Sequence, residues 1–283
     1  MSDAFASLLT ALGDDELVLG HRHSEWTGYA PHLEEDVAFS SIAQDEIGHA
    51  TAYYSLLAKV TDTDPDRLAL GRDKSGYRHA VVCERPNREW GYTLARHWFY
   101  DTADEIRLGS LELCADEDLA ALARKIRREE RYHLLHADSW MKRIARGPVE
   151  GRTKLMDAIG DTLSESLGIF EPFELEEAAV KEGLWPTPSD ELRERFLQRA
   201  AEELDVLGLP TEIHAHAAND AEFVASSSGD LIADQEGGDG GSADGQDTVA
   251  LGLGGRRGHH SADFDQLWED MTGQYRAHPG ATW

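Results

Sequence analysis

A glutamate precedes a histidine by three residues at two places in the sequence: Glu46 and His49 form one pair, and Glu130 and His133 form the other. Because residues three or four apart share one face of a helix, each pair lies in an apolar stripe that should face a core. Buried carboxylates and imidazoles are costly unless they are paired or bind a metal. One such residue is more often a satisfied polar group of the core, but two identical pairs favour a metal site.

In helical bundles, paired Glu-x-x-His segments are typical of di-metal sites, which need one further carboxylate from each of two other helices. The helix before the first pair offers Glu16, which lies 30 residues before Glu46. The helix before the second pair offers Asp101, 29 residues before Glu130, and Glu105, 25 residues before it. The repeated spacing favours Asp101. Glu105 remains the alternative, as a ligand or as a carboxylate that supports a ligand.

The candidate metal ligands are therefore four carboxylates and two imidazoles: Glu16, Glu46, His49, Asp101, Glu130 and His133. Oxygen-rich ligation without a thiolate suits two iron ions, or manganese, better than a structural zinc. Two divalent ions would also offset carboxylate charges that a core could not otherwise hold. Asp45 could hold a ligand histidine of the other pair, although it could equally be a solvated residue.

Long helices must position these residues, and apolar periodicity interrupted by Gly, Pro and Asp predicts where they lie. The expected helices are, in chain order, 4–27, 32–60, 87–114, 119–145, 151–183, 189–205 and 261–276. The first four form two short-looped pairs, which predicts an all-α fold built on an antiparallel four-helix bundle. The remaining C-terminal helices are expected to pack against the bundle.

The sequence predicts one helical domain over 1–225, an insertion over 226–258 and a C-terminal helix within 259–283 that packs on the same domain. The insertion is rich in Gly, Ser and Asp and has no helical periodicity, so we expect it to be flexible. Its simplest interpretation is a surface loop without chemistry.

The charge balance excludes several classes of function. Asp and Glu number 54 against 27 Lys and Arg, a formal charge of −27, which disfavours binding to nucleic acid or to an anionic membrane. No run of about 18 apolar residues predicts a membrane span, and the N-terminus does not resemble a secretion signal. Cys83 and Cys114 are far apart, which argues against a disulfide framework and indicates a reducing cytoplasm. The acidity would also suit a salt-rich cytoplasm.

A basic patch interrupts this acidity in the helix of the second pair. It consists of Lys125, Arg127, Arg128 and Arg131. The patch could meet a phosphate or an acidic partner, although a solvated helix face is the simpler interpretation.

Several segments of the chain resemble the phenylacetic acid catabolic PaaA/PaaC family over nearly the whole length. LGDDELVLGHRHSEWTGYAPHLEEDVAF, LARHWFYD, EERYHLLHADSW and the C-terminal RRGHH and PGATW look like PaaC-type subunits, and AQDEIGHATAYYS is similar to the catalytic PaaA-type subunit. The resemblance implies a ferritin-like fold. It also implies a multicomponent complex that uses dioxygen, and electrons from a separate reductase, to epoxidise the ring of phenylacetyl-CoA.

The chain departs from the PaaC-type pattern at the candidate site. As the resemblance has it, PaaC-type subunits are structural partners with apolar or amide residues where this chain has Glu16, Glu46, His49 and Glu130. We therefore expect a PaaC-like oxygenase component that keeps a PaaA-like di-iron site and contributes to 1,2-epoxidation of the acyl-CoA ring. The alternatives are a non-catalytic subunit that scaffolds a PaaA-like catalytic subunit, and a stand-alone ferritin-like di-iron oxidase.

Overall fold

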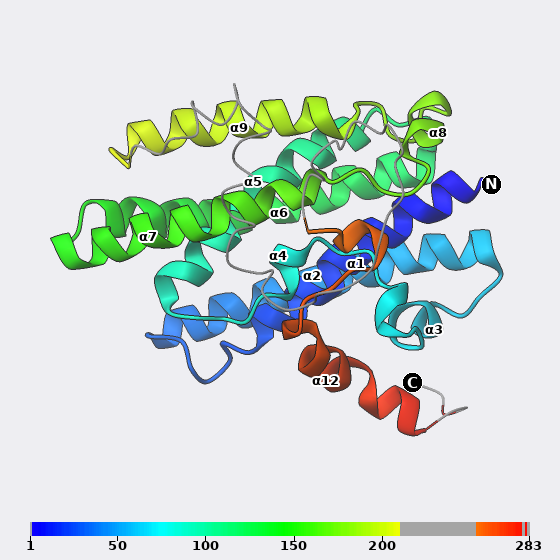
Figure 1. The fold of residues 1–283 in the computed structure, drawn as a ribbon, viewed down its shortest axis with the longest axis horizontal. Helices are drawn as coiled ribbons and strands as arrows, with labels where there is room; N and C mark the ends of the chain where they lie inside the picture. The colour runs from blue at the N-terminus through cyan, green and yellow to red at the C-terminus, as the bar shows by residue number, and fades with distance from the viewer. Residues whose placement is uncertain (1, 210–252, 279–280, 282–283) are drawn as a thin grey trace, which may run out of the picture.

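The computed structural model describes residues 2–209, 253–278 and 281. These residues form helices and connecting loops, with no strand among them. The long helices run side by side along the longest axis of the molecule (Figure 1). The predicted all-α class is confirmed, and the arrangement is that of a ferritin-like helical bundle. Within the described ranges, no helix is long and apolar enough to cross a membrane.

Two helical hairpins make the bundle. The first joins α1 (Asp3–Ser24) to α2 (Leu33–Thr61), and the second joins α5 (Trp90–Leu111) to α6 (Glu117–Ala145). The Ser2 side chain accepts a hydrogen bond from an N–H of the first turn of α1, as an N-cap residue does. The first hairpin is tightly packed at Gly20, where a Cβ atom would lie 2.9 Å from the Ile47 side chain. A glycine is therefore required for this approach of α1 to α2.

The second hairpin is covered by additional helices. After α6 come α7 (Val149–Ser166), η2 (Leu167–Phe170), α8 (Glu176–Lys181) and α9 (Ser189–Val206). The single helix predicted over 151–183 is wrong, because the chain leaves the helix before Pro172 and Glu171 is extended at φ −60° and ψ 128°. Proline has no N–H to donate and disfavours a helical residue before it.

Helix α5 is the centre of the packing. Every residue from Tyr92 to Asp104 is buried, because α6, α7 and α9 all pack against this helix. Phe196 of α9 packs against Phe99, which is wholly buried, with 6.0 Å between the ring centroids. The polar residues of this buried stretch therefore lie in the core.

Three short helices connect the hairpins: α3 (Pro65–Leu70), η1 (Lys74–Gly76) and α4 (Val81–Glu84). The C-terminal segment, with η4 (Gly255–Arg257) and α12 (Asp263–Ala277), packs beside them. In Figure 1, α12 lies on the opposite side of the bundle from α9.

The predicted flexible insertion at 226–258 lies mostly outside the described residues, but its last six residues differ from that prediction. Arg256 is 3% exposed and donates hydrogen bonds of 2.8 and 2.7 Å to the two carboxylate oxygens of Asp15. Arg107 donates to the same carboxylate at 2.7 Å. The buried Arg256 therefore fixes residues 253–258 against α1, which the composition of the insertion did not reveal.

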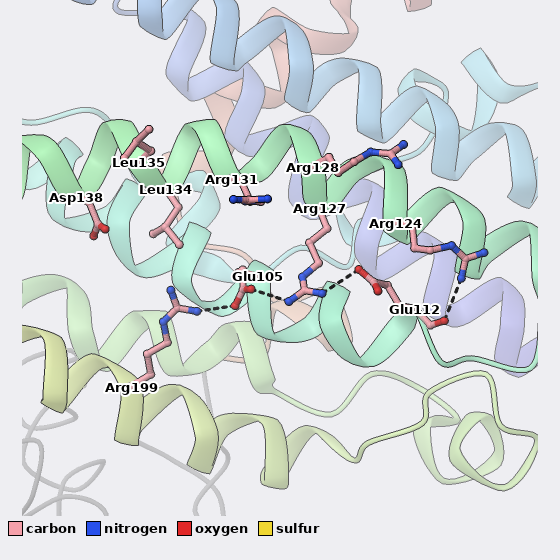
Figure 2. A pocket seen from close by; sticks show the side chains of 10 residues that line it. All are labelled: Glu105, Glu112, Arg124, Arg127, Arg128, Arg131, Leu134, Leu135, Asp138 and Arg199. Atoms are coloured by element: carbon pink, nitrogen blue, oxygen red, sulfur yellow. Dashed lines mark hydrogen bonds and ion pairs between the residues drawn. The ribbon is translucent and has the colours of Figure 1, made fainter.

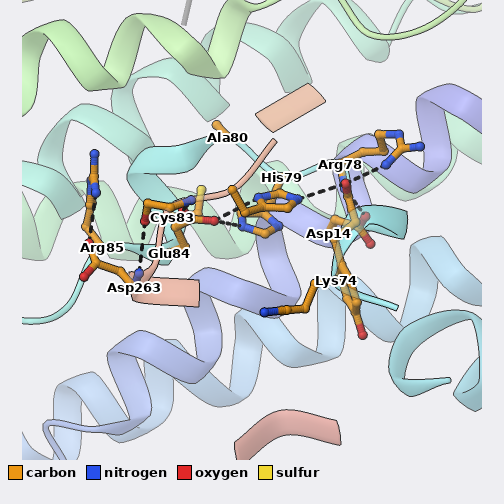
Figure 3. Close-up of polar contacts among 12 residues, drawn as sticks. Asp14, Lys74, Arg78, His79, Ala80, Cys83, Glu84, Arg85 and Asp263 are labelled. Carbon is orange, nitrogen blue, oxygen red and sulfur yellow. Dashed lines mark hydrogen bonds and ion pairs between the residues drawn. The ribbon is translucent and has the colours of Figure 1, made fainter. Parts of the chain in front are cut away.

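A second set of polar contacts ties the C-terminal segment to α4 (Figure 3). The Glu84 carboxylate lies 2.7 Å from Nε2 of His79 and 2.9 Å from Nδ1 of His260, and it accepts a 2.6 Å hydrogen bond from the Ser261 N–H. Next to it, Arg85 forms a 2.9 Å ion pair with Asp263. Burial alone would raise the pKa of Glu84, but the hydrogen bonds from His260 and His79 outweigh it and hold that pKa below its usual value.

Candidate metal centre

The structure brings the six predicted ligands together in the core of the bundle. One carboxylate comes from α1, one from α5, and a glutamate and a histidine come from each of α2 and α6. Their exposed fractions are 2% for Glu16, 1% for Glu46, 2% for His49, 0% for Asp101, 1% for Glu130 and 2% for His133. Both Glu-x-x-His pairs therefore face inward, as their apolar stripes predicted.

Glu130 lies between the two histidines. One of its oxygens is 3.3 Å from Nδ1 of His49 and 3.1 Å from Nδ1 of His133. Nδ1 of His49 also lies 3.2 Å from a Glu16 oxygen. One donor atom from each of Glu16, His49 and Glu130 lies within 4.8 Å of the others, so α1, α2 and α6 could hold one ion in common.

The outer nitrogens of the two histidines bind carboxylates of the opposite hairpin. Nε2 of His133 is 3.3 Å from an Asp45 oxygen, as the sequence suggested, and Nε2 of His49 is 3.0 Å from a Glu129 oxygen. Such contacts fix the ring orientation and leave Nδ1 to face the ligand cluster. Glu129 was missed, although it precedes Glu130 as Asp45 precedes Glu46.

Several donor atoms of the cluster have no hydrogen-bond partner within the described chain. Both oxygens of Asp101, both oxygens of Glu130 and Nδ1 of His133 are buried without a hydrogen bond. Leaving such atoms unpaired in a core is costly. Bound cations would satisfy such atoms, and a set of carboxylates and imidazoles suits iron or manganese. The residues present therefore fit a metal centre.

The electrostatics of the cluster lead to the same conclusion. Burial raises the pKa values of Glu46 and Asp101 well above the usual range of a carboxyl group. Burial alone would lower the pKa values of the two histidines, but interactions with Glu130 and the neighbouring carboxylates raise them to about 11 for His49 and about 12 for His133. Without a cation, the cluster balances its charge with protons, which a metal would displace.

The structure does not bring Glu105 to this cluster. Its side chain lies on the outer side of α5, 22% exposed, in an ion pair of 2.8 Å with Arg127 and another with Arg199 of α9 (Figure 2). Three residues of the predicted basic patch, Arg127, Arg128 and Arg131, line the same groove. Glu105 and Glu112 offset part of the groove's positive charge through their ion pairs with Arg127.

Other polar residues that surround the centre were not predicted as part of it. His23 Nδ1 lies 2.9 and 3.0 Å from the two oxygens of Glu46, and the Tyr100 hydroxyl donates to Glu16 at 3.0 Å. Asp104 is buried, and burial, partly offset by Arg107, raises its pKa to about 7. His23 was detectable, because it lies seven residues after Glu16 in the same helical stripe.

The fold and the site together define a ferritin-like protein with a buried carboxylate and histidine centre. The chain belongs to the phenylacetic acid catabolic protein family, which it matches over residues 1–222. Over 273 residues it is 29% identical to one of the subunits of 1,2-phenylacetyl-CoA epoxidase from Escherichia coli (strain K12), a match that covers 96% of each chain. These similarities confirm the resemblance seen in the sequence.

Proposed function

We propose that this chain is a subunit of a multicomponent phenylacetyl-CoA 1,2-epoxidase of aerobic phenylacetate degradation, and that it carries a di-iron site. The full-length similarity to an epoxidase subunit supports the first part. The observation that carries the second part is the buried meeting of two Glu-x-x-His pairs, of which Glu130 and Nδ1 of His133 have no hydrogen-bond partner in the described part of the chain. Manganese would suit the same donors.

Iron bound at this site would supply the activation of dioxygen, with electrons from a separate reductase. The chain itself would provide the ligands and the dry surroundings. Asp45 and Glu129 hold the two histidines, while Phe39 and Tyr53, both buried on α2, exclude water from either end of the first pair. The acyl-CoA substrate would be bound in the complex with a PaaA-like subunit.

A non-catalytic scaffold is the second candidate. The similarity to one epoxidase subunit, which spans 96% of both chains, suits this role as well. In that case the ligands would be present but would serve only the stability of the core. A stand-alone di-iron oxidase is less well supported, because the match extends along a whole epoxidase subunit.

The test is the metal content of the purified full-length chain after anaerobic reconstitution with ferrous iron. We expect about two irons per chain, and none in the double variant Glu46→Gln with Glu130→Gln. The matched control, Glu34→Gln with Glu117→Gln, changes exposed residues on the same two helices and should keep both irons. A metal-free wild-type chain that still binds a PaaA-like subunit would refute the di-iron proposal and leave the scaffold.

A further inference from the structure

His97 is a buried histidine whose ring makes no hydrogen bond within the described part of the chain. It lies on α5, four residues before Asp101, and is 0% exposed. Neither Nδ1 nor Nε2 has a hydrogen-bond partner among the residues that the structure describes. An imidazole must carry at least one N–H, so this burial leaves a donor and an acceptor unsatisfied, which is costly in a core. Such a position needs an explanation.

The position of the His97 ring beside Asp101 supplies an explanation. Nδ1 of His97 is 3.2 Å from an Asp101 oxygen, yet the two atoms form no hydrogen bond and both Asp101 oxygens are unpartnered. Nδ1 of His133 approaches a Glu130 oxygen in the same way, at 3.1 Å without a hydrogen bond. Donor atoms that bind one ion at about 2.0–2.2 Å lie about 3 Å from each other. The distances between His97 and Asp101 and between His133 and Glu130 are therefore those expected for two ligands of one ion.

The other histidines of this region each have a protein partner. His23 binds Glu46, and His136 binds Glu35 at 2.7 Å through Nε2. The His97 ring packs against these two rings and Phe39, with centroid separations between 5.2 and 5.7 Å. Among the histidines in the described part of the chain, His97 is the one with both nitrogens buried and unpartnered.

We propose that His97 is a seventh ligand of the metal centre and shares with Asp101 the ion that His133 binds. This inference rests on the proposed two-metal site. It makes the two metal positions chemically different: the position beside His49 has one imidazole, and the position beside Asp101 has two.

The test uses cobalt(II), whose absorption spectrum reports its ligands, on the metal-free full-length chain under anaerobic conditions. X-ray absorption at the cobalt edge of the wild-type chain counts imidazoles without any mutation. We expect three imidazoles for two cobalt ions, from His49, His97 and His133, whereas the site without His97 would show two.

The variants His97→Gln and His136→Gln are then titrated with cobalt(II). We expect His97→Gln to weaken one of the two binding events by at least about 10–100-fold and to change the spectrum. His136→Gln, which alters the adjoining ring of the same aromatic group, should keep both affinities within about twofold and the wild-type spectrum.

Three results would overturn the inference. They are two imidazoles in the wild-type chain, unchanged cobalt binding in His97→Gln, or equal losses in both variants, which would make the effect one of packing. A wild-type chain that binds no cobalt and no iron would instead refute the two-metal function itself, so the two failures are distinguishable.

Discussion

His133 of α6 and Asp45 of α2 meet across the bundle, with 3.3 Å between Nε2 and a carboxylate oxygen, although 88 residues separate them in the chain. His49 and Glu129 make the reciprocal contact at 3.0 Å. Each Glu-x-x-His helix therefore orients the histidine of the other with the acidic residue just before its own glutamate. These two reciprocal contacts connect the hairpins beside the candidate metal centre.

The two reciprocal contacts predict that removing either carboxylate partly lowers the metal affinity. Asp45→Asn and Glu129→Gln should each weaken metal binding by about 10–100-fold, because the histidine loses the charged partner that fixes its ring and raises its basicity. The measurement is an anaerobic titration of the metal-free chain with ferrous iron. Glu34→Gln, an exposed change on α2, should leave the affinity unchanged. Full affinity in both Asp45→Asn and Glu129→Gln would show that the contacts do not act on the site.

The structure also separates Asp101 from Glu105. Asp101→Asn should lose at least one of the two metals, because both oxygens of its buried carboxylate lack a hydrogen-bond partner among the described residues. Glu105→Gln should keep both metals and at most disturb the pairs with Arg127 and Arg199. Metal content and thermal stability of both variants would be measured together. Retention of two metals in Asp101→Asn, with loss in Glu105→Gln, would reverse the assignment.

Two neighbouring arginines near the C-terminus should differ in their effect on stability. Arg256→Ala leaves the buried Asp15 carboxylate with Arg107 as its remaining arginine partner, and we expect the free energy of unfolding to fall by about 3 kcal/mol. Arg257 is 56% exposed and paired with Glu171, so Arg257→Ala should cost less than about 1 kcal/mol. Equilibrium denaturation in urea of the full chain measures both free energies of unfolding. Similar losses in the two variants would show that the buried contact between Arg256 and Asp15 does not stabilise the fold more than the exposed pair of Arg257.

The Glu84 carboxylate should make the fold sensitive to acid. Its pKa in the folded chain lies below that of the unfolded chain, so its ionised form stabilises the fold above about pH 4.3. This stability is lost as the pH falls from there through the folded pKa. Wild type should therefore be more stable than Glu84→Gln at pH 7, and the difference should shrink as the pH approaches 3.

Melting temperatures across this pH range test that expectation. Glu177→Gln, an exposed change on α8, serves as the control and should follow the wild-type curve throughout. A difference between wild type and Glu84→Gln that stayed constant from pH 7 to pH 3 would show that the carboxylate charge is not the cause.

The sequence by itself determined the helical class, the two hairpins and the inward faces of both Glu-x-x-His pairs. These follow from the 3.6-residue period, which a single helix encodes locally, and from turn residues between helices. The repeated spacing of about 30 residues also selected Glu16 and Asp101, because equal distances from a turn lie at one level of a hairpin.

Only the tertiary structure decided how these helices meet. It showed that Glu105 lies outside the centre. Glu105 follows Asp101 by one helical turn of α5, and at that position the side chain contacts the arginine-lined groove instead of the metal ligands. It placed Glu129 and His97 around the site, because Glu129 contacts His49 on another helix and His97 contacts Asp101 of the centre itself. It also revealed the buried Arg256, whose role depends on Asp15, more than two hundred residues earlier. Contacts of this kind leave no periodic trace in the chain.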